Sequence, residues 1–143
     1  MTASDKAKRM LVVDEGLRLK PYRCSAGKLT IGYGHNLDDI GISENVANAM
    51  LEEDLRIAER DCKRIFGDLY NTWSENRKLG WVNLAFNLGY VRLMRFRNTL
   101  RAARIEDWEQ VETGLRNSLW FRQVKGRAER VIEMICRETF PYS

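Results

Sequence analysis

Residues 44–66 are the feature of this 143-residue sequence that most restricts its fold, because apolar residues recur there at helical spacing along the whole segment. Ser43 can cap the start of such a helix and Gly67 can end it. A helix of this length would reach about 35 Å, enough to cross from one lobe of a small protein to another. The pattern therefore predicts two lobes joined by a long helix. Its apolar positions are Val46, Ala47, Met50, Leu51, Leu55, Ala58, Cys62, Ile65 and Phe66.

A β-hairpin is predicted before the long helix. Residues 17–22 can run extended, residues 25–28 form a turn, and residues 29–33 alternate as a strand does. Cys24 and Thr30 are then expected on either side of the turn, with Thr30 in the returning strand.

The sequence after the long helix is helical and rich in tryptophan. All four tryptophans lie in this half, and most are expected in the core because large aromatic side chains dominate helical cores. The fold class is therefore α+β, mainly α. Further helices are predicted at 77–88, 96–103, 107–115 and 126–137, with a turn at 117–121 leading into another.

Composition excludes several classes of protein. No apolar run approaches the roughly 18–20 residues that span a membrane, and the polar N-terminus lacks the apolar region of a secretory signal. We therefore expect a cytoplasmic protein unless something else releases it. The three cysteines are too few for a disulfide framework or a zinc site. Cys62 and Cys136 fall on apolar helix faces and are expected in the core, which Cys24 is not.

The charge of the chain is unevenly distributed. Residues 1–70 hold 11 Lys and Arg against 12 Asp and Glu, whereas residues 71–143 hold 13 against 8. The second half therefore carries a net +5 and can attract polyanions such as nucleic acid, a membrane surface or an acidic cell wall. A solvated surface that only aids solubility explains the same charge equally well.

Glu15, Cys24 and Thr30 are the candidate catalytic residues. Ser4 is predicted to cap a first helix that Gly16 ends, so Glu15 falls at the helix C-terminus. Partial negative charge there favours a protonated carboxyl, as a general acid requires, whereas a nearby arginine would act in the opposite direction. Glycoside cleavage also needs a group that activates water or attacks the sugar. A thiol and a hydroxyl can position water, or the thiol can act as base or nucleophile.

Other chemistries fit the same stretch less well. His35, the only histidine, lies eleven residues from Cys24 and would have to orient on it in a cysteine protease. Its neighbours instead suit a turn. Gly32 and Gly34 permit a close backbone approach to a helix or ligand, but a nucleotide site needs a third glycine that opens a helix. One histidine among scattered acids does not indicate a metal site.

Several motifs resemble the phage-type, T4-lysozyme-like family of endolysins, glycoside hydrolase family 24. The family pattern is Glu, eight residues, Asp or Cys, five residues, Thr, and Glu15, Cys24 and Thr30 match it. The segments that carry the resemblance are D-E-G-L-R-L-K-P-Y from Asp14, T-I-G-Y-G-H from Thr30, N-L-A-F-N-L-G at 83–89, F-R-N-T-L at 96–100, and S-L-W-F-R-Q-V-K-G-R-A-E-R-V-I at 118–132.

The resemblance implies a single lysozyme-like domain over residues 1–143. A small lobe of about 14–45 would hold the hairpin, and the long helix of about 44–66 would connect it to a helical lobe of about 1–13 and 67–143.

The resemblance also implies hydrolysis of the β-1,4 bond between N-acetylmuramic acid and N-acetylglucosamine in peptidoglycan, causing lysis of the host cell. Glu15 would protonate the leaving oxygen, while Cys24 and Thr30 would position or activate water, with inversion at the anomeric carbon. The implied substrate contacts are Asn36, Phe86 and Thr99. The implied supporting residues are Asp14, His35, Arg127 and Arg130. The two arginines would pair with the C-terminal end of the first helix, which carries Asp14 and Glu15.

Three departures from the family pattern are visible. Cys24 replaces the common aspartate, Gly114 replaces a cleft asparagine, and the segment from His35 to Ser43 is shorter. The resemblance implies a monomer without cofactor, metal, nucleic acid or membrane insertion. It would be held in the host cytoplasm until a holin lesion releases it to the wall.

Three alternatives belong to other classes: a non-catalytic peptidoglycan-binding relative, a lytic transglycosylase that forms an anhydro sugar, and a DNA-binding protein.

Overall fold

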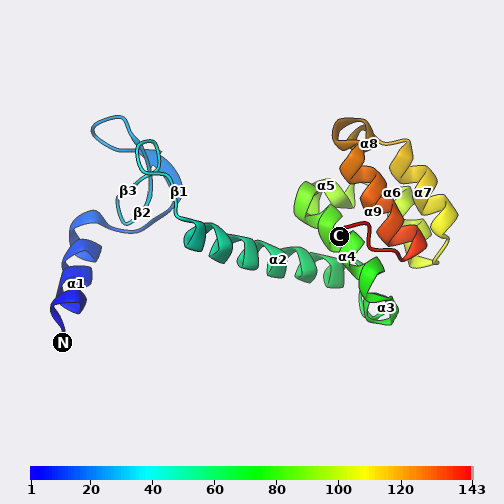
Figure 1. The fold of residues 1–143 in the computed structure, drawn as a ribbon, viewed down its shortest axis with the longest axis horizontal. Helices are drawn as coiled ribbons and strands as arrows, with labels where there is room; N and C mark the ends of the chain where they lie inside the picture. Colours follow the sequence, from blue (N-terminus) through cyan, green and yellow to red (C-terminus); the bar gives the residue numbers. More distant parts are fainter. Residues whose placement is uncertain (143) are drawn as a thin grey trace. The chain divides into compact units, whose positions relative to one another are not determined.

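The structure of this chain is a computed structural model that describes residues 1–142. The chain divides into two compact units, Met1–Ala49 and Met50–Ser143. The long helix α2, Glu44–Phe66, begins in the first unit and continues into the second (Figure 1). Its bounds confirm the prediction, and the Ser43 hydroxyl accepts a hydrogen bond from the Val46 amide at 3.2 Å. Among the described residues, no helix is both long and apolar enough to cross a membrane.

The first helix, α1, runs from Ala3 to Glu15 and is capped at both ends. The prediction that Ser4 caps it is wrong, because Thr2 and Asp5 form a reciprocal capping box two residues earlier. The Thr2 hydroxyl accepts from the Asp5 amide, and the Asp5 carboxylate accepts from the Thr2 amide, both at 3.1 Å. Gly16, at φ 71°, ends the helix as predicted.

The first unit also holds a three-stranded antiparallel sheet in the order β1-β2-β3. Strand β1 is Arg18–Arg23, β2 is Leu29–Gly32 and β3 is His35–Asn36. The pairing of β1 with β2 is irregular between Arg18 and Tyr22. Pro21 lies in that interval, where its missing N–H group removes a donor from the ladder. The predicted hairpin is thus confirmed, and a short third strand is added where a turn was expected at His35.

The second unit is a bundle of helices, and most of the predicted helices are present within a residue or two of their expected ends. The short helices α3 and α5 were not predicted. The bounds are α3 Asp68–Thr72, α4 Glu75–Leu88, α5 Tyr90–Met94, α6 Arg97–Arg104, α7 Trp108–Arg116, α8 Leu119–Val124 and α9 Gly126–Arg137.

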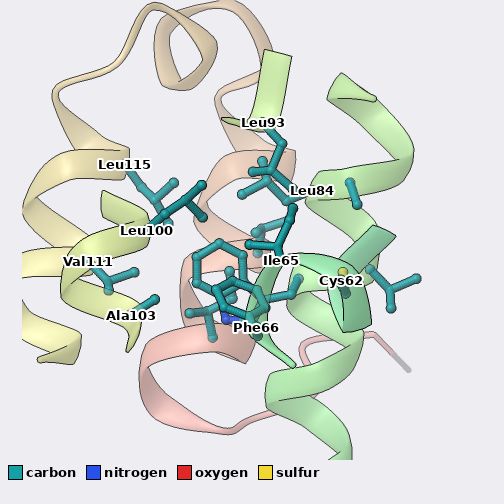
Figure 2. Close-up of a cluster of buried hydrophobic side chains, with 14 of the residues drawn as sticks. Cys62, Ile65, Phe66, Leu84, Leu93, Leu100, Ala103, Val111 and Leu115 are labelled. Carbon is teal, nitrogen blue, oxygen red and sulfur yellow. The ribbon is translucent and has the colours of Figure 1, made fainter. Parts of the chain in front are cut away.

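The core of the second unit surrounds Trp81, which is fully buried. The Phe66 ring meets Trp81 edge-on at a centroid distance of 4.8 Å and Trp73 at the same distance. The end of α2 therefore supplies part of the core, and Cys62 is buried there as predicted. Figure 2 shows Cys62 and Phe66 beside side chains from α4 to α7.

Helices α4 and α9 pack very closely at Gly80. A Cβ atom at this position would lie 2.9 Å from the Met134 Cβ and 3.0 Å from the Ile135 backbone nitrogen. Real Cβ atoms do not approach other atoms so closely, so the absence of a side chain at Gly80 sets the distance between the two helices.

Candidate active site

Glu15 lies at the C-terminal end of α1, where its carboxyl group packs against the backbone of Gly34. A Cβ atom on Gly34 would come within 2.6 Å of Glu15 Oε2 and 2.9 Å of its Cδ. Gly34 has a φ of 71° and lies in the turn between β2 and β3. The sequence suggested that another group could approach the backbone closely at Gly32 or Gly34. In the structure that group is the carboxyl of Glu15, and it approaches Gly34.

Thr30 occupies the central strand of the sheet and is almost completely buried, at 3% exposure. It pairs with Tyr22 of β1 on one side and with Asn36 of β3 on the other. Its hydroxyl donates to the Lys28 carbonyl at 2.8 Å. The strand that carries Thr30 thus continues into the turn that contacts Glu15.

Cys24 follows β1 directly and is held in the hairpin turn. Its amide donates to the Lys28 carbonyl at 2.9 Å, and its carbonyl accepts from the Gly27 amide at 2.8 Å. The thiol is free and partly exposed. The structure therefore places Cys24 and Thr30 at the same turn, as the sequence predicted, with Lys28 in contact with both.

The surroundings of Cys24 favour its thiolate. The backbone amides of Lys28 and Ala26, and to a smaller degree the Thr30 hydroxyl, lower the pKa of the Cys24 thiol. The Thr30 hydroxyl has one proton, which it can donate either to the Lys28 carbonyl or to the sulfur.

The other two thiols differ from Cys24 in this respect. Burial raises the pKa of Cys62 to about 12 and that of Cys136 to about 11. Cys24 is thus the thiol best suited to react or to accept a proton.

The loop after β3 is fixed by His35 and Asn36. His35 Nε2 lies within hydrogen-bond distance of the Gly41 carbonyl. The Asn36 side chain donates to the Asp39 carboxylate and accepts from the Asp39 amide, both at 3.0 Å. His35 thus lies in β3 and anchors the loop that follows it, and the Asn36 side-chain amide is hydrogen-bonded within the same loop.

Thr99 lines a cleft of about 410 Å³ in the second unit. A Cβ atom at Gly114 would come within 2.1 Å of Thr99 Oγ1. The Thr99 hydroxyl therefore occupies the space that a side chain at position 114 would need. The cleft is lined by Leu88, Arg92, Arg95, Phe96, Arg97, Asn98, Thr99, Gly114, Ser118, Leu119, Trp120 and Gln123.

Phe86 and Arg127 line a different, largely apolar cavity of about 440 Å³. Arg127 Nε donates to Asn83 Oδ1 at 2.9 Å. The guanidinium carbon of Arg130 lies 5.3 Å from the centre of the Tyr142 ring. Asp14 and Glu15 belong to the other unit, and their pairing with these arginines stays a prediction. Phe86 and Thr99 are thus found in separate hollows of one unit.

Two features of the site were not foreseen from the sequence. One is the packing of Glu15 against Gly34, for which the paired glycines were the available signal. The other is the presence of Arg92, Arg95 and Arg97 around the Thr99 cleft, which no local motif announces. Within residues 1–142, no group of three or more His, Cys, Asp and Glu side chains is arranged to hold a metal ion.

Comparison with known proteins adds three relatives. The chain is 32% identical to the pre-baseplate central spike protein Gp5 of Enterobacteria phage T4, over 88% of this chain and 27% of that protein. It is 28% identical to probable T4-type lysozyme 2 of Dictyostelium discoideum, over 89% of this chain and 91% of that protein. A third relative, an endolysin of Acyrthosiphon pisum secondary endosymbiont phage 1, is 44% identical over 38% of this chain and 40% of its own length.

These relatives differ in how much of them the chain represents. It spans about a quarter of the spike protein and about nine-tenths of the Dictyostelium protein. The sequence profile of the phage lysozyme family matches residues 13–135, which include the helix end that carries Glu15, the hairpin and nearly all of the helical unit. The chain belongs to the phage lysozyme family of glycoside hydrolases.

Proposed function

We propose that this chain is a muramidase that hydrolyses the β-1,4 bond between N-acetylmuramic acid and N-acetylglucosamine in peptidoglycan. The observation that carries the proposal is the position of Glu15, Cys24 and Thr30 in the first unit, at the end of α1, in the hairpin turn and in β2. Glu15 packs on the turn after β2, and Cys24 and Thr30 flank the hairpin turn before it. Membership of the phage lysozyme family supports the same reaction.

In this mechanism Glu15 donates the proton to the leaving glycosidic oxygen. The Gly34 backbone borders the carboxyl group on one side and so limits its conformations before substrate binds, which reduces the entropy lost on reaching the transition state.

Cys24 and Thr30 hold the attacking water. The hydroxyl of Thr30 donates to the Lys28 carbonyl, which leaves its oxygen lone pairs available to accept a hydrogen bond from water. The lowered pKa of the Cys24 thiol lets the sulfur accept a proton from that water more readily than an ordinary thiol does. Attack from the face opposite the leaving group inverts the anomeric carbon.

The proposal extends to substrate contacts and to release. Thr99 contacts the glycan strand from the cleft of the second unit. Asn36 contacts it from β3, and Phe86 contacts it from the apolar cavity of the second unit. The protein acts as a monomer and reaches the wall of the host cell through a membrane lesion made by a holin-type partner, which leads to lysis.

Mass spectrometry of the products tests the reaction class. Purified peptidoglycan is digested with the wild-type chain in water enriched in ¹⁸O. The expected products carry a reducing end with one heavy oxygen. Anhydro sugars, lighter by one water and without the label, would instead identify a transglycosylase. Binding without any cleavage would identify a non-catalytic relative.

A further inference from the structure

Asp61 is a buried acidic residue that the proposed reaction does not use. It lies on α2 and is only 8% exposed. Its carboxylate makes no hydrogen bond or ion pair with any residue in the range 1–142. Burial of a carboxylate without a donor is strongly unfavourable, so a native structure that contains one calls for a partner from outside the chain.

The side chain of Asp61 opens onto a small hollow of about 180 Å³ between α2 and the end of α4. Within residues 1–142, the fully enclosed side-chain nitrogen and oxygen atoms without a partner are Trp81 Nε1 and Arg130 Nε. The unpartnered oxygens of Asp61 are therefore not sealed in the core but reach the hollow. We call it the acidic hollow, and it is lined by Asp54, Ile57, Ala58 and Asp61 of α2 and by Ala85, Phe86 and Gly89.

The charges around the acidic hollow are negative. Asp54 adds a second, exposed carboxylate on the same face of α2, and no basic residue from the described part of the chain lines the hollow. Helix α4 ends at Leu88, where the carbonyl groups of the last turn add partial negative charge. Arg64, one turn after Asp61, is instead stacked over the Tyr90 ring, 4.1 Å from its centre.

This environment fits a small cation that brings its own hydrogen-bond donors. An ammonium group has three N–H donors, which carboxylates and helix carbonyls can share. A divalent metal ion needs about six oxygen ligands, more than two carboxylates supply. The hollow is also smaller than the roughly 300 Å³ of a site for a whole ligand, so it suits one end of a chain. Ile57 and Phe86 offer apolar contact for the carbons next to the ammonium group.

We propose that the acidic hollow binds the ammonium end of a small aliphatic amine, such as a diamine. The site is separate from the cleft that Thr99 lines, and it shares only Phe86 with the apolar cavity. A bound amine would contact both α2 and α4, so its binding should stabilise the second unit. This inference does not depend on the proposed function.

Titration of the full-length chain with diaminobutane tests the assignment, by calorimetry and by thermal unfolding at constant ionic strength. Butanediol is the matched neutral probe, because it keeps the carbon chain and replaces each ammonium group by a hydroxyl. The variants are Asp61→Asn and Asp54→Asn. The control variant is Asp68→Asn, which removes an exposed carboxylate outside the acidic hollow.

Diaminobutane should bind to wild type and raise its Tm, whereas butanediol should do neither. Asp61→Asn should weaken the binding of diaminobutane about tenfold or more, because a charge-assisted hydrogen bond is lost. Asp54→Asn should weaken it less, since Asp54 is exposed, and Asp68→Asn should bind as wild type does. Without amine, Asp61→Asn should have a Tm at or above that of wild type, because an unpaired buried charge has been removed.

Three results would overturn the assignment: no binding of diaminobutane to wild type, an equal effect of butanediol, or an equal loss of affinity in Asp68→Asn. If Asp61→Asn does not fold, the comparison of the two other variants decides. Asp54→Asn must then bind diaminobutane more weakly than Asp68→Asn, and equal affinities would show that the acidic hollow is not the site.

A free amine of the cell and a diamino acid in the peptides of the cell wall present the same ammonium group. Sedimentation with peptidoglycan, before and after acetylation of its amino groups, distinguishes these sources in chains that carry Glu15→Gln. Weaker sedimentation caused by Asp61→Asn on untreated wall alone identifies the wall amine, and no change on either material identifies the free amine. Equal weakening on both materials would show that Asp61 does not act through an amine.

Discussion

At the scale of single residues, Gly34 is the position that tests most directly the proposed role of Glu15 as general acid. A methyl group there would meet the Glu15 carboxyl at 2.6 Å, whereas at Gly32 it would meet nothing within 4 Å. Both glycines have positive φ, near 70°, so alanine costs about 1–2 kcal/mol of backbone strain at either position.

We predict that Gly34→Ala lowers kcat about tenfold or more by displacing the carboxyl group, while Gly32→Ala keeps kcat and loses a similar amount of stability. Turbidity assays beside thermal unfolding separate the two effects. Equal kcat values for the two variants would show that the contact at Gly34 does not position Glu15.

The thiol of Cys24 gives a second prediction for a single side chain. Because backbone amides and the Thr30 hydroxyl lower its pKa, iodoacetamide at pH 7 should alkylate Cys24 well before Cys62 and Cys136, whose pKa values burial raises. Peptide mass spectrometry measures the order of labelling.

Thr30→Val should slow the labelling of Cys24, and Thr30→Ser should restore it, because only serine keeps the hydroxyl. If Cys24 in the Thr30→Val variant reacts at the wild-type rate, the Thr30 hydroxyl does not influence the reactivity of the thiol.

Among the helices, the contact of α4 with α9 depends on Gly80. Alanine is the better helix former by about 1 kcal/mol, but its methyl group would lie 3.0 Å or less from Ile135 and 2.9 Å from the Met134 Cβ. Overpacking of this kind costs about 1–3 kcal/mol, so Gly80→Ala should be destabilising.

Thermal unfolding should give a Tm several degrees below wild type for Gly80→Ala. Gly126→Ala is the matched control, since its methyl group would meet only Arg130 Nη1, at 3.6 Å, and should not lower Tm. A Tm for Gly80→Ala at or above the wild-type value would contradict the packing argument.

The elements also show how far the sequence could predict the fold. Long helices such as α2 and α9 were predicted at their observed bounds, because several turns of apolar periodicity average out single exceptions. Helices α3 and α5 have five residues each, too few for a period to appear, and each follows directly on a glycine at positive φ, Gly67 or Gly89, of the kind that also ends helices.

Prediction of the candidate site was similarly divided. The spacing of Glu15, Cys24 and Thr30 was enough to single out candidate residues in the first unit, because residues that flank a hairpin turn are close in sequence as well as in space. The cleft that Thr99 lines depends on how α5, α6, α7 and α8 pack, which no local sequence pattern encodes.

Stability of the whole chain should depend on acid pH through ion pairs that join α7 to α9. A hydrogen bond from Arg116 at 2.7 Å, with further contribution from Arg137, lowers the pKa of Glu112. A carboxyl whose pKa is lower in the folded state stabilises the fold above its unfolded pKa, about 4.3, and this contribution is lost as pH falls through the folded pKa.

We therefore predict that Glu112→Gln has a lower Tm than wild type at pH 7. The difference in Tm between the two proteins should become smaller as pH falls below about 4. Glu109→Gln, an exposed neighbour on α7 outside this network, should follow wild type at each pH. A constant gap between Glu112→Gln and wild type from pH 7 to pH 3 would contradict the assignment of this pH dependence to Glu112.

The activity of the whole molecule is tested most directly by lysis of chloroform-treated Gram-negative cells with wild type and Glu15→Gln. Glu52→Gln serves as the control, because it removes one exposed carboxylate outside the site. A lost general acid typically costs about 10²–10⁴ in rate, so Glu15→Gln should be at least a hundredfold slower with an unchanged Tm, and Glu52→Gln should match wild type. Lysis by a folded Glu15→Gln variant at more than about a tenth of the wild-type rate would contradict the assignment of Glu15 as the general acid.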